Sequence, residues 1–180
     1  VGYMSNTIQD YFGDYYEGIS IEYVNENAPL GTGGAILNVL TNIKTSPLII
    51  ITNGDTWFNV DFNVLFYDFI KHQKPLLIGL VKVENNKRFD VVGLDNNGIV
   101  NLFGAHDQIS TLINAGIYLA RSDYLYPIMK KFDKNFSFEL QVLPLLAMKG
   151  DISSSIHNKK FIDIGIPNDY KRAQNFVFEY

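Results

Sequence analysis

Two uninterrupted apolar runs constrain the fold of this 180-residue chain more than any other feature of its sequence. The runs PLIIIT and PLLIGLV, at residues 47–52 and 75–81, each have the length of one strand. A strand that is apolar at every position is typical of a sheet covered on both faces, as parallel α/β sheets are. Both runs are far too short to span a membrane. The chain is therefore predicted to build its core around a doubly covered sheet.

Helical patterns alternate with strand patterns along the chain. Apolar spacing predicts helices over about residues 5–11, 32–43, 61–73 and 136–150, and over 167–176, where Pro167 suits a first turn. Further strands are predicted at residues 18–26, 112–121 and 159–165, with two short strands around a turn within 88–103. This alternation predicts a single α/β domain with a mostly parallel sheet and some antiparallel additions. Ligands of such sheets bind beyond the carboxyl ends of the strands.

Composition excludes several classes of protein. The net charge of −4 argues against a nucleic-acid binder held by phosphate contacts, which normally has a basic face. The absence of cysteine excludes disulfides, thiolate metal sites and a cysteine nucleophile. No signal peptide or membrane-spanning run is evident, so we expect a cytoplasmic protein without a membrane partner.

A glycine-rich turn stands directly before one of the predicted helices. The stretch NAPLGTGGAILNVL, residues 27–40, places three glycines around Thr32. Glycine allows a positive φ and a close approach of ligand to backbone, and a helix N-terminus presents unpaired N–H groups to polar or anionic ligands. A tight strand-to-helix turn that binds nothing would explain the same pattern. The stretch by itself leaves both interpretations open.

Two aspartates follow apolar strands at places where α/β sites lie. Asp55 comes directly after LIIITNG, and Asp163 lies inside FIDIGIP. A charge in an apolar strand must be paired, hydrated or metal-bound, and carboxylates are natural ligands of Mg²⁺. Two carboxylates from distant strands could therefore hold Mg²⁺ together. The alternatives are a turn aspartate at position 55 and a helix cap at position 163.

Two further polar residues interrupt apolar segments. Asn114 lies in INAGIY beside Gly116, where an amide and a small neighbour leave room for a ligand, although a strand bulge at Gly116 would also explain the pattern. Glu139 lies in the first turn predicted after Ser137, where the helix dipole alone favours an acid.

Five motifs in this order make the sequence resemble the sugar nucleotidyltransferase family, also called nucleoside-diphosphate-sugar pyrophosphorylases. They are PLGTGGAI (29–36), TNGDTWF (52–58), LINAGIYL (112–119), FSFELQVLP (136–144) and FIDIGIPNDYKRA (161–173). The LGTGGAI form and the IDIGIP ending look most like heptose 1-phosphate guanylyltransferases (D-glycero-D-manno-heptose) of bacterial surface-polysaccharide pathways. The resemblance implies a Rossmann-like three-layer α/β/α fold. It also implies transfer of a nucleotide from an NTP, here GTP, to a sugar 1-phosphate, with release of pyrophosphate.

The resemblance also implies a role for each matching position. Nucleotide binding falls to Gly31, Thr32, Gly33 and Gly34. The two aspartates, Asp55 and Asp163, would act in catalysis by holding Mg²⁺, and Asn114 and Glu139 would hold sugar hydroxyls. The implied partners are an NTP and a sugar 1-phosphate.

The sequence departs from the family pattern in two places. The family opens with a strand and a glycine-rich loop that carries arginine, followed by a lysine, and nothing here matches them. We therefore expect residues 1–180 to be one catalytic domain that is incomplete at its N-terminus and does not turn over alone. In RFDVVGLD, Asp90 stands where the family has glycine, which puts sugar binding there in doubt. Mannose or glucose 1-phosphate transfer, a non-catalytic sugar-nucleotide binder and an unrelated α/β domain remain the alternatives.

Overall fold

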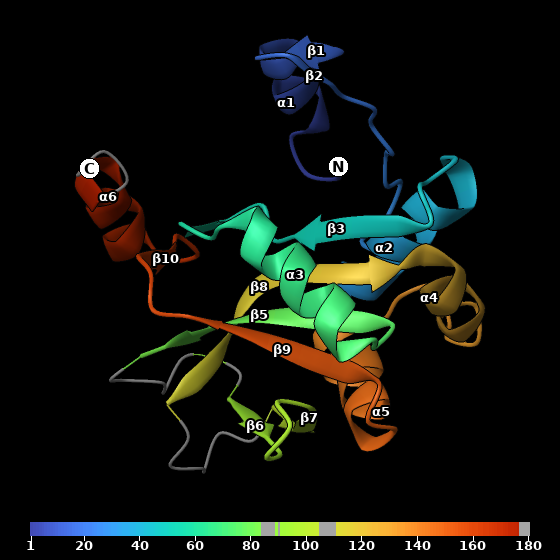
Figure 1. Ribbon diagram of the computed structural model, residues 1–180. Helices are drawn as coiled ribbons and strands as arrows, with labels where there is room; N and C mark the ends of the chain where they lie inside the picture. The colour runs from blue at the N-terminus through green and yellow to red at the C-terminus, as the bar shows by residue number, and fades with distance from the viewer. Residues whose placement is uncertain (84–88, 90, 105–110, 177–180) are drawn as a thin grey trace.

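Both apolar runs become strands of one central sheet in the computed structural model of the chain (Figure 1). The structure describes residues 1–83, 89, 91–104 and 111–176. Its strands are β1 (Tyr15–Tyr16), β2 (Ile19–Ser20), β3 (Leu48–Thr52), β4 (Thr56–Phe58), β5 (Leu76–Lys82), β6 (Val92–Leu94), β7 (Val100–Phe103), β8 (Leu112–Arg121), β9 (Ile152–His157) and β10 (Phe161–Asp163). Its helices are α1 (Ser5–Phe12), α2 (Gly31–Asn42), α3 (Phe62–His72), α4 (Ser122–Met129), the π-helix η1 (Phe138–Val142), α5 (Leu143–Met148) and α6 (Pro167–Phe176).

The central sheet has the strand order β3-β8-β5-β9 and is mixed. Strand β8 pairs antiparallel with both β3 and β5, and β5 pairs parallel with β9. The prediction of a mostly parallel sheet is therefore wrong. The reason is physical: helical layers cover both faces, so β8 is apolar along most of its length whatever its direction.

The first apolar run lies at an edge of this sheet and not in its interior. Within the described chain β3 has β8 as its strand partner on one side, and its residues are only partly buried. Ile50 is 42% exposed, whereas the first six residues of β5 are all buried. The predicted burial is therefore correct for β5 and wrong for β3.

Two apolar clusters fill the space on the two faces of the sheet. One packs β5, β8 and β9 side chains such as Ile78, Tyr118 and Ile152 against α2, α4, η1 and α5. The other packs alternate residues of β5 and β8, such as Leu77 and Leu119, beneath Leu65 of α3. Alternation along the strands sends successive side chains to opposite clusters. The three-layer α/β/α arrangement expected from the resemblance is thus present.

The N-terminal segment stands apart from the sheet (Figure 1). The predicted first helix is present as α1, although no residue in it is buried; Met4, with a φ of 55°, directly precedes it. The strand predicted over residues 18–26 shortens to β2, which pairs with β1 as a small hairpin. No helix in the described part of the chain is long and apolar enough to cross a membrane.

Two short pairings and one irregular helix complete the fold. β4 and β10 pair antiparallel, and β6 and β7 form the predicted hairpin. The helix predicted over residues 136–150 begins as η1 and continues as α5. Ser137 caps η1 by accepting the Leu140 N–H, and Pro144 lies in the first turn of α5. π-Helical turns are rare in proteins, and those that occur are often found at functional sites.

Candidate functional site

Asp55 lies in the turn that joins β3 to β4, at the carboxyl end of β3. The backbone before it is anchored to β8, because the Asn53 N–H donates to the Gly116 carbonyl at 2.8 Å. The backbone of Asp55 itself is anchored to the segment after β10, because its carbonyl accepts the Ile164 N–H at 2.9 Å. The position predicted from the sequence, beyond a strand end, is therefore where Asp55 is found.

Asp163 is the last residue of β10 and pairs in register with Thr56 of β4. Its Oδ1 accepts the Gly165 N–H at 2.9 Å. A Cβ built on Gly165 would lie 3.0 Å from Oδ1 of Asp163 and 3.9 Å from Oδ2 of Asp55. The two carboxylates thus converge on Gly165, although they are more than a hundred residues apart in sequence.

Asn114 lies on β8 where the strand is irregular. The pairing of β8 with β5 shifts register between Ile78 and Leu80, opposite the stretch that contains Gly116. Gly116 has a φ of +69°, and a Cβ there would approach the Asn53 side chain to 2.7 Å. The bulge considered from the sequence is therefore present, and it coexists with the polar site. Asn114 Oδ1 accepts the Gly116 N–H at 2.9 Å, and its Nδ2 donates to the Tyr118 hydroxyl at 2.7 Å.

Glu139 lies in η1 and is held by two hydroxyl groups. Thr32 Oγ1 donates to its Oε2 at 2.5 Å, and Ser137 Oγ donates to the same oxygen at 3.1 Å. Thr32 Oγ1 also accepts the Phe138 N–H at 2.9 Å, so one threonine joins α2 to η1. Within the described chain both bonds end on Oε2, which leaves Oε1 of Glu139 available to a ligand.

The glycines at the start of α2 pack against the protein's own chain. The N–H groups of Gly33 and Gly34 both donate to the Phe136 carbonyl, at 3.0 and 3.3 Å. A Cβ on Gly33 would lie 2.3 Å from the Phe136 ring, and a Cβ on Gly34 would lie 2.4 Å from the Lys134 carbonyl oxygen. Gly31 has a φ of +70°, and a Cβ there would lie 2.5 Å from the Phe136 carbonyl oxygen. Close internal packing is therefore a sufficient reason for all three glycines.

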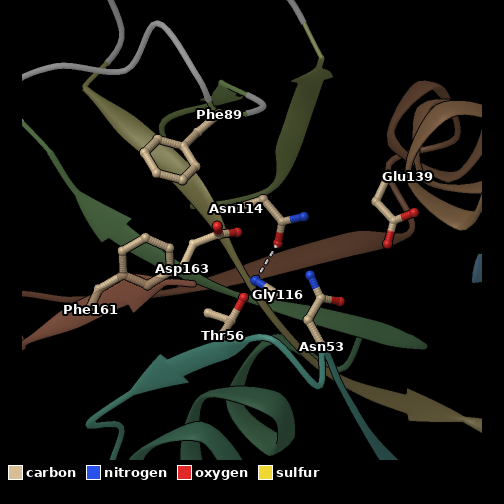
Figure 2. Close-up of a pocket in the computed structure, with 8 residues that line it drawn as sticks. All are labelled: Asn53, Thr56, Phe89, Asn114, Gly116, Glu139, Phe161 and Asp163. Carbon is tan, nitrogen blue, oxygen red and sulfur yellow. Dashed lines mark hydrogen bonds between the residues drawn. The ribbon is translucent and has the colours of Figure 1, made fainter. Parts of the chain in front are cut away.

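Two neighbouring pockets join these residues into one candidate site. The smaller, of about 180 Å³, is shown in Figure 2 and is lined by Asn53, Thr56, Phe89, Asn114, Gly116, Glu139, Phe161 and Asp163. The larger, of about 590 Å³, is lined by Thr32, Ala35, Ile36, Ile51, Thr52, Asn53, Gly54, Asp55 and Glu139. Asn53 and Glu139 belong to both linings, so the two pockets share a wall.

Some lining residues escaped the sequence analysis. Phe89 and Phe161 form an edge-to-face pair with centroids 5.6 Å apart, and Figure 2 shows them together across the small pocket from Glu139. Their sequence patterns are those of ordinary core aromatics. Asn53 has a better signal, since it stands between an apolar strand and Gly54. Asp90, whose effect was in doubt, lies outside the described residues.

The carboxylates of the site suit a divalent cation that a substrate helps to bind. No group of three or more histidines, aspartates or glutamates that could hold a metal occurs in the described ranges. Mg²⁺ usually binds through one or two carboxylates together with substrate phosphates and water. The convergence of Asp55 and Asp163 fits that mode, because it supplies oxygen ligands without closing the coordination shell.

The sequence and fold are similar to those of known nucleotidyltransferases. The profile of the nucleotidyl transferase family matches residues 2–179. A D-glycero-alpha-D-manno-heptose 1-phosphate guanylyltransferase of Aneurinibacillus thermoaerophilus is 34% identical over 99% of this chain and 76% of its own length. A protein of the same name from Campylobacter jejuni is 33% identical over 94% of this chain and 73% of its own length.

A solved structure gives the same result for the fold. The crystal structure of HddC from Yersinia pseudotuberculosis complexed with GMP-PN has a TM-score of 0.81 and 29% identity, over 97% of this chain and 75% of that one. This chain thus spans about three quarters of the length of each of these three proteins. It belongs to the nucleotidyl transferase family and is a nucleotidyltransferase of the sugar-1-phosphate class, with heptose 1-phosphate guanylyltransferases among its relatives.

Proposed function

We propose that this protein joins a heptose 1-phosphate to GTP, with release of pyrophosphate, to give a nucleoside-diphosphate sugar for surface-polysaccharide synthesis. One observation carries the proposal. Asp55 and Asp163 converge on Gly165 beside a pocket lined by the Asn114 amide and the Glu139 carboxylate. A cation-binding pair next to hydroxyl-binding groups is the arrangement that a sugar phosphate and a nucleotide need together.

Asp55 and Asp163 would hold Mg²⁺ at the phosphates. When bound, the cation would supply charge neutralisation at the α-phosphate and at the departing pyrophosphate. Three carboxylates line the two pockets in the described part of the chain, so an anionic substrate would meet repulsion without a cation between them. The acidic lining thus supports a metal-dependent reaction.

Asn114 and Glu139 would hold the sugar by different chemistry. The Asn114 amide can both donate and accept, whereas the Glu139 carboxylate only accepts. Because Thr32 and Ser137 both bind Oε2, Oε1 of Glu139 can accept from a sugar hydroxyl without breaking the internal network. Such preset groups would orient the sugar phosphate for attack.

The larger pocket would hold the nucleotide, with residues Gly31, Thr32, Gly33 and Gly34 at its edge. Thr32 lines that pocket directly. The N–H groups of Gly33 and Gly34 are engaged by Phe136, so these two glycines would act by shaping the pocket edge and not by donating hydrogen bonds to the base.

In the reaction an oxygen of the sugar 1-phosphate attacks the α-phosphorus of GTP. The bond from that phosphorus to the oxygen bridging toward the β-phosphate breaks, and its electron pair leaves with pyrophosphate. No covalent bond to the protein is needed, so these residues contribute by positioning and charge stabilisation.

Pyrophosphate release tests the proposal. The protein, as its source organism makes it, is assayed with each of five NTPs against heptose, mannose and glucose 1-phosphates, with and without Mg²⁺. The expected result is Mg²⁺-dependent release that is fastest with GTP and heptose 1-phosphate. A preference for mannose or glucose 1-phosphate would overturn the sugar assignment while leaving the reaction class in place.

A binding measurement on this 180-residue chain distinguishes an enzyme from a non-catalytic sugar-nucleotide binder. Calorimetry with GTP and Mg²⁺, repeated on Asp55→Asn and Asp163→Asn variants, measures whether the two aspartates hold the metal. Binding that is equally tight with and without Mg²⁺, together with no turnover for any pair, would favour a non-catalytic sugar-nucleotide binder.

A further inference from the structure

Tyr118 is a buried tyrosine whose hydroxyl group is directed at the proposed sugar site. It lies on β8, is 1% exposed, and belongs to the apolar cluster beneath α2, α4 and η1. A phenylalanine would fill an apolar cluster without the cost of burying a hydroxyl. The hydroxyl accepts a hydrogen bond from Asn114 Nδ2 at 2.7 Å, which gives the polar atom a partner inside the core.

The contact between these two residues depends on the irregularity of β8. In a regular strand, residues four apart are separated by about 13 Å. Their side chains are brought within hydrogen-bond distance because Gly116, with its positive φ, bends the strand between them. The bend also turns the Gly116 N–H onto Asn114 Oδ1 at 2.9 Å. Both ends of the amide are therefore held by the protein before any ligand binds.

Tyr118 also reaches the opposite wall of the small pocket. Its ring meets the ring of Phe138 edge to face, with centroids 5.3 Å apart. Phe138 is fully buried and directly precedes Glu139 in η1. The Tyr118 side chain thus contacts both Asn114 and η1, the helix that carries Glu139.

We propose that Tyr118 is a positioning residue that fixes the amide orientation of Asn114 and sets its distance from Glu139, so that the pair fits one arrangement of sugar hydroxyls. This inference rests on the proposed function, since it assigns Asn114 and Glu139 to the sugar. Tyr118 need not touch the substrate. With one amide hydrogen and one lone pair already used, Asn114 can offer the sugar one donor and one acceptor in fixed directions.

The test is the Tyr118→Phe variant, which removes the acceptor for Asn114 and keeps the ring against Phe138. We expect the KM for the sugar 1-phosphate to rise about fivefold, the effect of losing one neutral hydrogen bond. The KM for the NTP should stay within twofold of wild type. An unchanged sugar KM would overturn the proposal, as would an equal rise in both KM values.

A matched control separates positioning from a loss of stability. Tyr124 is a partly buried tyrosine, and its hydroxyl donates to Asp151 away from both pockets. Tyr124→Phe should lower the Tm at least as much as Tyr118→Phe but leave both KM values unchanged. If Tyr124→Phe raised the sugar KM as well, the effect of Tyr118→Phe would be one of stability alone.

A double-mutant cycle tests whether Tyr118 acts through Asn114. In an Asn114→Ala background, Tyr118→Phe should have no further effect on the sugar KM, because the amide that it orients is gone. If the rise in sugar KM of the double variant equals the product of the two single-variant rises, Tyr118 does not act through Asn114.

One measurement does not depend on turnover. The Asn114 side-chain NH₂ pair can be assigned in a ¹⁵N spectrum of this chain from its disappearance in Asn114→Asp. We expect one of its protons to exchange slowly in wild type and quickly in Tyr118→Phe, and equal exchange in both proteins would overturn the hydrogen bond. If this result holds while no sugar 1-phosphate is a substrate, the proposed function fails and the structural link stands.

Discussion

The wall that carries Glu139 and the wall that carries Asp55 and Asp163 face the same pockets, but their side chains are held by different means. In the first, the η1 wall (Thr32 and residues 136–139), the carboxylate receives two hydroxyl bonds and the backbone is packed against the glycines of α2. In the second, the β4–β10 wall (residues 55–58 and 161–165), two three-residue strands bring two carboxylates together.

The difference indicates that the two walls have different roles. The hydroxyl groups of Thr32 and Ser137 already hold the Glu139 side chain in the folded protein, so its carboxylate is oriented before a ligand binds. Asp55 and Asp163 converge on Gly165, and a cation bound between them would offset the repulsion of their like charges. Changes in the β4–β10 wall should therefore affect chemistry more than stability, and changes in the η1 wall should affect both.

The largest effect is expected for Asp163→Asn. The amide oxygen can still accept the Gly165 N–H, so the turn after β10 should survive. Loss of one metal-binding charge should lower the rate of pyrophosphate release at least about 100-fold. Asp123→Asn, which removes an exposed aspartate paired with Arg121, is the matched control and should retain full activity. A loss below tenfold in Asp163→Asn would place the cation elsewhere.

A large effect on stability is expected for Gly34→Ala. Helix propensity alone would favour alanine by about 1 kcal/mol. The added Cβ, however, would lie 2.4 Å from the Lys134 carbonyl oxygen and 2.8 Å from the Leu30 Cβ, so backbone must move. We expect a net loss of about 1–3 kcal/mol, or roughly 2–4 °C of Tm for each kcal/mol.

Gly54→Ala is the control for that substitution. A Cβ at Gly54 meets no atom within 4 Å, and Gly54 lines the larger pocket. Thermal unfolding of both variants should show a lower Tm for Gly34→Ala alone. A Tm for Gly34→Ala equal to or above wild type would mean that the start of α2 can shift away from residues 134–136.

A smaller effect is expected for Thr32→Val, which keeps the shape of the side chain and removes its hydroxyl. The Phe138 N–H and Glu139 Oε2 each lose a partner, which should cost about 1 kcal/mol and also raise the sugar KM. Thr32→Ser keeps the hydroxyl and should restore both properties nearly to wild type. If the serine and valine variants behave alike in urea unfolding and in kinetics, the hydroxyl does not hold the η1 wall.

The smallest expected effect is a pH dependence of stability that arises from His157, which lies beside the β4–β10 wall. His157 packs edge to face against Phe58 of β4. Burial lowers the pKa of His157 below 6.5, against the opposing influence of Asp68 and Asp61. The folded state therefore binds fewer protons than the unfolded state, so this contribution to stability is present above pH 6.5 and is lost as the pH falls through the lowered pKa.

Thermal unfolding at pH 7.5 and pH 5.5 measures that contribution. The Tm of wild type should fall more between these pH values than the Tm of His157→Gln. Equal slopes for wild type and His157→Gln would show that the histidine is as easily protonated in the folded chain as in the unfolded one.

Local patterns in the sequence were enough to predict much of this architecture. β5 could be recognised because a short apolar run bounded by Pro75 and the charged Lys82 is typical of a buried strand. Asp55 could be singled out as a charge at the end of an apolar strand, and Asp163 as a charge inside an apolar segment. Their convergence on Gly165 agrees with the expectation that strand ends meet at one edge of the sheet.

The remaining features depend on partners that are distant in the sequence. The direction of β8 leaves no local mark, since both of its faces are covered in either orientation. The internal packing of the α2 glycines could not be predicted, because the Phe136 ring, about a hundred residues away, is not visible in a local pattern. The π-helix at Glu139 likewise has no signal in the sequence FELQV, and its contact with Thr32 joins residues 106 apart.

The bulge at Gly116 has a consequence for how the chain reaches this structure. β8 must pair with β3 on one side and β5 on the other, and a slip by one residue would exchange its two apolar faces at little local cost. Only one alignment puts a residue without a side chain against Asn53 and a positive φ where the ladder shifts. We therefore expect Gly116 to favour the native register of β8, because any other alignment would place a side chain against Asn53.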